Sequence, residues 1–108
     1  MAQRRGVKIT VIKRLKTSDI LDKEAQEMAP DVESPCPRFK EGDEFTINDI
    51  SEYPKNFSCP WAFQDIFKEI MHLGLGGSFP WIKGKDAIIS CCTDGLRPVI
   101  FKIEALES

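Results

Sequence analysis

The clearest pattern of apolar and polar positions predicts one long amphipathic helix over residues 59–74. Pro60 suits the first helical turn, which places Cys59 at the N-cap, and Gly74 marks the C-terminal end. A helix with one broad apolar face packs against a sheet. The apolar face comprises Trp61, Ala62, Phe63, Ile66, Phe67, Ile70, Met71 and Leu73, and the polar stripe comprises Gln64, Asp65, Lys68, Glu69 and His72.

Alternating apolar and polar residues predict strands on both sides of this helix. Residues 6–15 alternate from Val7 to Val11, and residues 43–49 place Phe45 and Ile47 inward. Residues 86–92 and 97–106 read as two more strands, joined by the turn 93–96. The sequence therefore predicts a sheet of about four strands.

A shorter helix is expected in the N-terminal half, over residues 17–29. Thr17 or Ser18 is its N-cap, and Pro30 ends it. Residues 29–42 form a proline-rich loop, and disorder is considered for residues 1–5. The fold class is α+β: a small antiparallel curled sheet or half-barrel of about four strands packed on one long helix, plus the short helix. Residues 1–108 form a single domain.

Pro98 suggests a register for the last hairpin. Because proline has no N–H, it belongs at a position that does not donate to the ladder. A four-residue loop at 93–96 satisfies this, with Cys91 opposite Pro98 and Cys92 opposite Arg97. A three-residue loop would instead place Cys91 opposite Arg97. One face then carries Ile88, Ser90, Cys92, Arg97, Val99, Phe101 and Ile103, and we assign it to the core.

The pairing of Cys92 with Arg97 is the first candidate site. Opposed Cβ atoms lie ~5 Å apart, and a guanidinium at that distance lowers a cysteine pKa. The competing interpretation is a buried small hydrophobe beside an exposed arginine. Cys59 offers a second polarised thiol, because the positive end of a helix dipole stabilises a thiolate. Alternatively Ser58 caps that helix and Cys59 is merely buried.

The other two cysteines carry weaker signals. Cys36 lies between two prolines in an extended segment and alone indicates little. Cys91 and Cys92 are strand neighbours that point to opposite faces, so they do not make the close pair that structural zinc uses. We therefore predict no metal site.

Aromatic residues after the long helix suggest a pocket. The glycines of residues 74–77 let the following segment fold back over the core, so that Phe79 and Trp81 join Trp61 around a ligand. The alternative is that these rings complete a small core. Asp94 would serve as an acid or base, although a turn explains an Asp-Gly pair without chemistry.

Composition and charge narrow the class of protein. Hydrophobic residues make up 42% and charged residues 30%, which excludes wholesale disorder. The net charge of −2 argues against nucleic-acid binding. No apolar run approaches the roughly 20 residues of a membrane span, so we expect no membrane partner. Without an export signal the cysteines are expected to be reduced thiols in a cytoplasmic protein.

Four motifs together resemble a known family. They are CPRFKEGDEF at residues 36–45, CPWAF at 59–63, GGSFPW at 76–81 and CCTDGLRPVIFKI at 91–103. As a set they resemble a family of small single-domain proteins known mainly from microbial genomes. The resemblance implies no activity, cofactor or catalytic residue.

Two hypotheses follow from the residues. In the first, a small enzyme or thiol-chemistry protein uses Cys92 as nucleophile or ligand, Arg97 to anchor an anionic group, and Cys59 as a second thiol. Its partner would be a small molecule, and the cofactor is left open. In the second, the protein is a non-catalytic binding or assembly module in which the cysteines fill the core and residues 79–81 form a contact surface. A homo-oligomer fits either hypothesis.

Overall fold

The computed structural model describes residues 4–29, 34–84 and 86–106, and the long helix predicted from the sequence is present in it. This helix, α3 (Pro60–Gly74), begins after Cys59, as the position of Pro60 indicated. Pro30, the predicted end of the shorter helix, lies outside the described residues. Within the described part of the chain, no helix is both long and apolar enough to cross a membrane.

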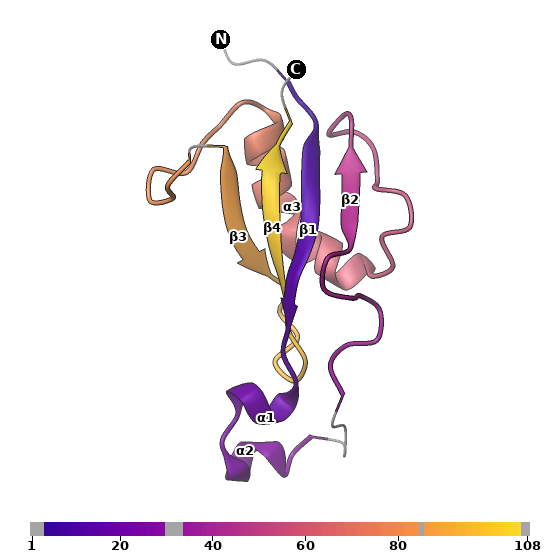
Figure 1. Ribbon diagram of the computed structural model, residues 1–108, viewed down its shortest axis with the longest axis vertical. Helices are drawn as coiled ribbons and strands as arrows, with labels where there is room; N and C mark the ends of the chain where they lie inside the picture. The colour runs from indigo at the N-terminus through magenta and orange to yellow at the C-terminus, as the bar shows by residue number, and fades with distance from the viewer. Residues whose placement is uncertain (1–3, 30–33, 85, 107–108) are drawn as a thin grey trace.

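Four antiparallel strands form an open, curled sheet, and α3 packs across one of its faces (Figure 1). The strands are β1 (Val7–Arg14), β2 (Glu44–Ile47), β3 (Ala87–Cys91) and β4 (Val99–Ala105). Their order in the sheet is β2-β1-β4-β3, so β1 and β4 form the centre. The predicted fold class is therefore confirmed.

The core lies between α3 and the inner face of the sheet. Alternate residues of β1 and β4 point inward, where Val7, Ile9, Phe101 and Ile103 are fully buried. The ring of Phe39, from the loop before β2, lies 5.4 Å from the ring of Phe101 and extends the core toward one end of the sheet. From α3 the core receives Ala62, Ile66, Ile70 and Leu73.

The apolar face of α3 is narrower than the sequence pattern predicted. Trp61 is 63% exposed and Phe67 is also exposed, because only every third or fourth position faces the small sheet. Conversely Glu69, assigned to the polar stripe, is only 8% exposed. Its carboxylate accepts a hydrogen bond from Ser90 at 2.9 Å and pairs with Lys68 at 3.0 Å.

The prediction of a single helix over residues 17–29 is wrong. Two short helices, α1 (Thr17–Ile20) and α2 (Lys23–Gln26), are separated by extended backbone at Leu21. The break occurs because Asp22 caps a new helix: its carboxylate accepts from the Ala25 N–H at 2.8 Å. The N-cap of α1 is Lys16, and the hydroxyl of Thr17 instead donates to the Leu96 carbonyl at 2.8 Å.

The predicted register of the β3–β4 hairpin is also wrong, by two residues. Cys91 pairs with Ile100, and the Cys92 N–H donates to the Val99 carbonyl at 3.1 Å. Cys92 is therefore opposite Val99 rather than Arg97. The loop is longer than four residues because Asp94 organises it internally, accepting from the Leu96 N–H at 2.8 Å. A shift of two residues leaves each side chain on its predicted face.

A β-bulge at Ile12 changes the direction of the end of β1. Val11 pairs with Phe101, but Lys13 and not Ile12 pairs with Ile100, so one extra residue is inserted. Both Ile12 and Lys13 are exposed as a result, and the next residue returns to the inner face opposite Val99. That residue is Arg14, which reaches the site described below.

Candidate functional site

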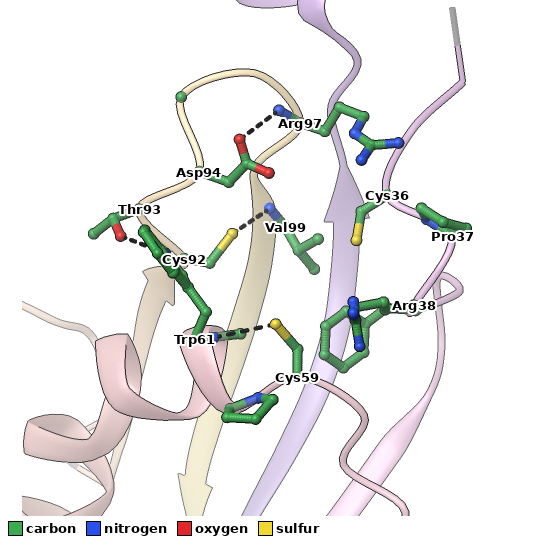
Figure 2. Close-up of a pocket in the computed structure, with 14 residues that line it drawn as sticks. Cys36, Pro37, Arg38, Cys59, Trp61, Cys92, Thr93, Asp94, Arg97 and Val99 are labelled. Atoms are coloured by element: carbon green, nitrogen blue, oxygen red, sulfur yellow. Dashed lines mark hydrogen bonds between the residues drawn. The ribbon is translucent and has the colours of Figure 1, made fainter. Parts of the chain in front are cut away.

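A pocket of about 830 Å³ opens at the end of the sheet where α3 begins (Figure 2). Three segments far apart in the sequence enclose it: residues 36–39, the first turn of α3 with its cap, and the loop from β3 to β4. Its lining residues are Cys36, Pro37, Arg38, Phe39, Cys59, Pro60, Trp61, Ala62, Cys92, Thr93, Asp94, Gly95, Arg97 and Val99.

Three of the four cysteines line this pocket. Cys36 and Cys59 are partly buried, and Figure 2 shows their sulfur atoms pointing into the cavity from opposite sides. Cys92 is buried in its wall. Cys91 is exposed on the other face of the sheet, as the strand alternation predicted. All four are free thiols.

Cys92 lies in an environment that keeps its thiol neutral. Its side chain is only 8% exposed, and this burial raises its pKa above the usual thiol range. The N–H of Val99, 3.3 Å from the sulfur, acts in the opposite direction but does not overcome burial. The expected lowering of the Cys92 pKa by Arg97 is therefore wrong, since the register that opposed the two residues does not form.

Cys59 occupies the N-cap position that the sequence predicted. Its backbone is extended, and its sulfur accepts a hydrogen bond from the Ala62 N–H at 3.5 Å. The sulfur thus lies at the positive end of a 15-residue helix and faces the cavity. Capping by Ser58 does not occur, because the Ser58 hydroxyl donates to the Arg38 carbonyl at 2.7 Å.

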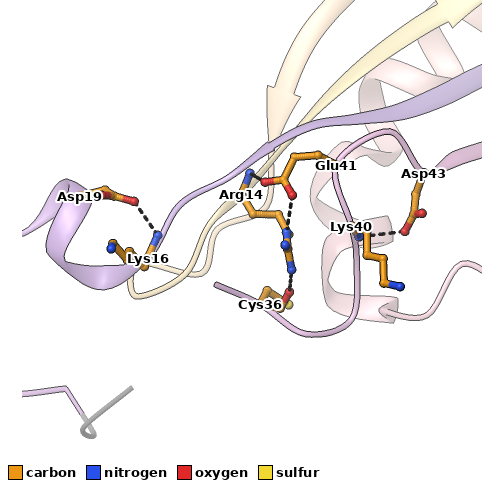
Figure 3. A network of polar contacts seen from close by, with 7 residues as sticks. All are labelled: Arg14, Lys16, Asp19, Cys36, Lys40, Glu41 and Asp43. Atoms are coloured by element: carbon orange, nitrogen blue, oxygen red, sulfur yellow. Dashed lines mark hydrogen bonds and ion pairs between the residues drawn. The ribbon is translucent and has the colours of Figure 1, made fainter. Parts of the chain in front are cut away.

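Cys36 reaches the pocket because Arg14 holds its segment (Figure 3). The Arg14 guanidinium donates to the Cys36 carbonyl at 3.0 Å and pairs with Glu41 at 2.9 Å. Hydrogen bonding to its own N–H, and then to Arg14, lowers the pKa of Glu41. Sequence reasoning missed this contact, because the bulge at Ile12 that turns Arg14 inward left no signal in the apolar pattern.

Trp61 is held over the pocket by a short polar network. Its indole N–H donates to the Thr93 hydroxyl at 2.8 Å, and the Thr93 N–H donates to Asp65 at 2.7 Å. Asp65 thereby connects α3 to the β3–β4 loop. Neither Thr93 nor Asp65 was singled out from the sequence. Trp61 was singled out, and it lines this pocket.

Two arginines give the pocket positive charge. Arg38 donates to the Ser58 carbonyl at 2.7 Å, which keeps its side chain beside the helix start. Arg97 extends along the rim toward residues 36–38 (Figure 2). Among the described residues, no hydrogen bond or ion pair engages its guanidinium; only its N–H is bonded, to Asp94 at 3.3 Å. Asp94 lines the pocket as well, with one oxygen committed to the loop.

Phe79 and Trp81 are not brought to this pocket. The Phe79 ring lies 4.7 Å from the ring of His72, near the opposite end of α3, and 5.3 Å from Trp81. His72 also contacts the Ser78 carbonyl at 2.8 Å, so these rings and the helix end form a separate cluster. The site therefore contains one of the three predicted aromatic residues.

Among the residues that the structure describes, no three His, Cys, Asp or Glu side chains are grouped to hold a metal ion. Comparison with family models, curated proteins and solved structures finds no match to this chain. The family resemblance of the motifs thus stays a prediction. Those motifs contribute many of the lining residues, from the 36–39, 59–62 and 92–97 segments.

Proposed function

We propose that this protein binds a small organic anion in the three-cysteine pocket. The observation that supports this most is the convergence of Cys36, Cys59 and Arg97, from three separate segments, on one cavity. Pockets that combine apolar walls with a few polar groups are typical small-molecule sites.

Each part of the lining has a role in this proposal. Arg97, whose guanidinium has no partner among the described residues, anchors the anionic group of the ligand. Trp61, fixed by Thr93, offers a flat apolar surface for the rest of the ligand. Arg38, from the segment toward which Arg97 extends, adds positive charge to the lining. Cys92, kept neutral by burial, shapes the cavity.

Thiol chemistry on the bound molecule is a second candidate. The observation that favours it is the placement of the Cys59 sulfur at the start of α3 and in the cavity. A thiol in that position would be the nucleophile, with Arg97 orienting the substrate. This assigns to Cys59 the nucleophilic role that was predicted for Cys92.

The binding proposal is tested with 1-anilinonaphthalene-8-sulfonate, which carries an aromatic body and one sulfonate. We expect saturable fluorescence enhancement, with amide NMR shifts concentrated at the non-proline residues of 36–39, 59–62 and 92–97. Arg97→Ala should weaken binding by at least about tenfold, because a charge-assisted hydrogen bond is worth about 1.5–3 kcal/mol and about 1.4 kcal/mol corresponds to tenfold. Arg97→Lys should retain part of the affinity.

Arg4→Ala is the matched control, because Arg4 is an exposed arginine paired with Asp49, away from the pocket. It should leave the dissociation constant unchanged. Circular dichroism of each variant establishes that the protein to which the dye binds is folded. Shifts spread over the surface, or equal affinity for the wild type and Arg97→Ala, would overturn the proposal.

A further inference from the structure

One edge of the sheet carries backbone groups that are available for pairing. β3 is an edge strand, bonded only to β4. The Cys92 N–H donates to the Val99 carbonyl, and the Ala105 N–H donates to the Asp86 carbonyl at 2.8 Å. The backbone N–H and C=O groups of the even-numbered residues therefore point toward β4. Because hydrogen bonding alternates along a strand, the N–H and C=O groups of Ala87, Ile89 and Cys91 point outward. Within the described residues, no strand accepts them.

The chemistry of this edge differs from that of the other edge. β3 has five residues and no charged side chain among them. Ile89 is 50% exposed, and Cys91 is exposed beside it. At the opposite edge, β2 has four residues, and its Glu44 pairs with Lys8 at 3.5 Å. Charge on an edge strand discourages pairing with another chain, and its absence permits it.

Self-pairing satisfies the edge completely. In an antiparallel arrangement about a two-fold axis at Ile89, each Ala87 lies opposite Cys91 of the second copy. The outward groups of Ala87, Ile89 and Cys91 then all find partners, since the three positions pair among themselves. The two Ile89 side chains meet on the outer face of the sheet, where an apolar cross-strand pair is stabilising.

The lack of charge favours an uncharged strand as the occupant. An edge without charged side chains has nothing with which to select an acidic or basic peptide, whereas an identical strand matches it in length, polarity and register. We propose that β3 of one copy pairs antiparallel with β3 of a second copy about Ile89, which joins the two sheets into one. This interface is independent of the pocket and of its proposed ligand.

A five-residue strand pair buries less area than the roughly 1,000 Å² of a stable interface, so the dimer is expected to be weak and concentration-dependent. Analytical ultracentrifugation over a concentration series should show the monomer converting to a dimer. Ile89→Lys should shift the equilibrium to monomer, because two lysines would be opposed across the axis. Thr46→Lys, the matched change at the exposed position on β2, should leave it unchanged.

A cysteine cross-link tests the register itself. Cα atoms of a hydrogen-bonded antiparallel pair lie about 5.5 Å apart, within disulfide range. With oxidised glutathione as the oxidant, Ala87→Cys should therefore bond to Cys91 of the second copy and give a covalent dimer. The double variant Ala87→Cys with Cys91→Ser should not form it.

Two results would overturn the proposal. The first is a wild-type protein that stays monomeric across the concentration series while the Ala87→Cys variant does not cross-link. The second is a dimer that Ile89→Lys does not weaken, since that dimer would use another surface. Thermal unfolding of each variant confirms that it is folded when measured.

Discussion

At the scale of single residues, two adjacent cysteines have opposite surroundings. Cys91 is exposed on the outer face, while Cys92 is buried and accepts the Val99 N–H. Strand alternation alone separates them, so their difference was predictable from the sequence. The pKa of Cys92 was not, because it depends on burial by the surrounding segments.

Alkylation with iodoacetamide should distinguish these two thiols. In the native protein Cys91 is expected to react readily, because its side chain is exposed. Cys92 should stay unmodified under the same conditions, because burial both raises its pKa and blocks access. Peptide mass spectrometry with fragmentation measures both sites. Equal labelling rates in the native protein would contradict this assignment, and equal rates in denaturant provide the control.

Glu41 should titrate below the usual range of a glutamate. Its own N–H and Arg14 favour the charged carboxylate, which lowers its pKa. The stabilisation is therefore present above the unfolded-state pKa and is lost as the pH falls through the folded-state pKa. Carboxyl carbon NMR should show the low midpoint.

Replacing the arginine tests the cause of that shift. Arg14→Ala should raise the midpoint of Glu41 toward its ordinary value without reaching it, because the bond to its own N–H remains. The amide signals of Cys36 and Arg38 should move in the same variant, since Arg14 holds the Cys36 carbonyl. An unchanged midpoint in Arg14→Ala would show that the pair does not set the pKa.

At the scale of helices and strands, features that depend on neighbouring residues were predictable from the sequence. Features that depend on contacts between residues far apart in the sequence were not. The extent of α3, its Cys59 cap and the faces of β3 and β4 follow from short-range periodicity. The prediction of the β3–β4 register was wrong because Asp94, and the contact between Thr93 and Asp65, shape the loop that joins the two strands. Asp65 lies 28 residues before Thr93, and no local pattern reports such a contact.

That contact should contribute measurably to stability. Asp65→Ala removes the carboxylate that accepts the Thr93 N–H, and hydrogen bonds to charged groups are worth about 1.5–3 kcal/mol. Urea denaturation should show a loss in this range, with faster amide exchange at Thr93. Gln64→Ala, at the exposed neighbouring position, is the control and should change stability by less than about 0.5 kcal/mol.

At the scale of the whole molecule, the pocket and the end of α3 are stabilised separately. The structure extends over 51 × 30 × 20 Å, and the pocket lies at the helix start. At the helix end, Arg5 donates to the carbonyls of Leu73 at 2.8 Å and Gly77 at 2.9 Å. Arg5 therefore joins the beginning of the sheet to the last turn of α3, far from the cysteines.

Replacing Arg5 should lower the free energy of unfolding but leave ligand binding at the pocket unchanged. Arg5→Ala leaves two helix-end carbonyls without their charged donor, so we expect a loss of about 1.5–3 kcal/mol in unfolding free energy. Dye affinity at the pocket should be unchanged. Arg4→Ala, whose ion pair with Asp49 is exposed, should cost at most about 1 kcal/mol. An equal loss in both variants would contradict the role given to Arg5.

The central pairing of β1 with β4 has a consequence for synthesis on the ribosome. β1 is translated first but bonds along its length to β4, with Val7 opposite Ala105. The middle of the sheet therefore cannot assemble until nearly the whole described chain has left the exit tunnel. Until then β1 can pair only with β2, which leaves its other edge unpaired. Chaperone contact with nascent chains should thus begin at β1 and end when β4 emerges.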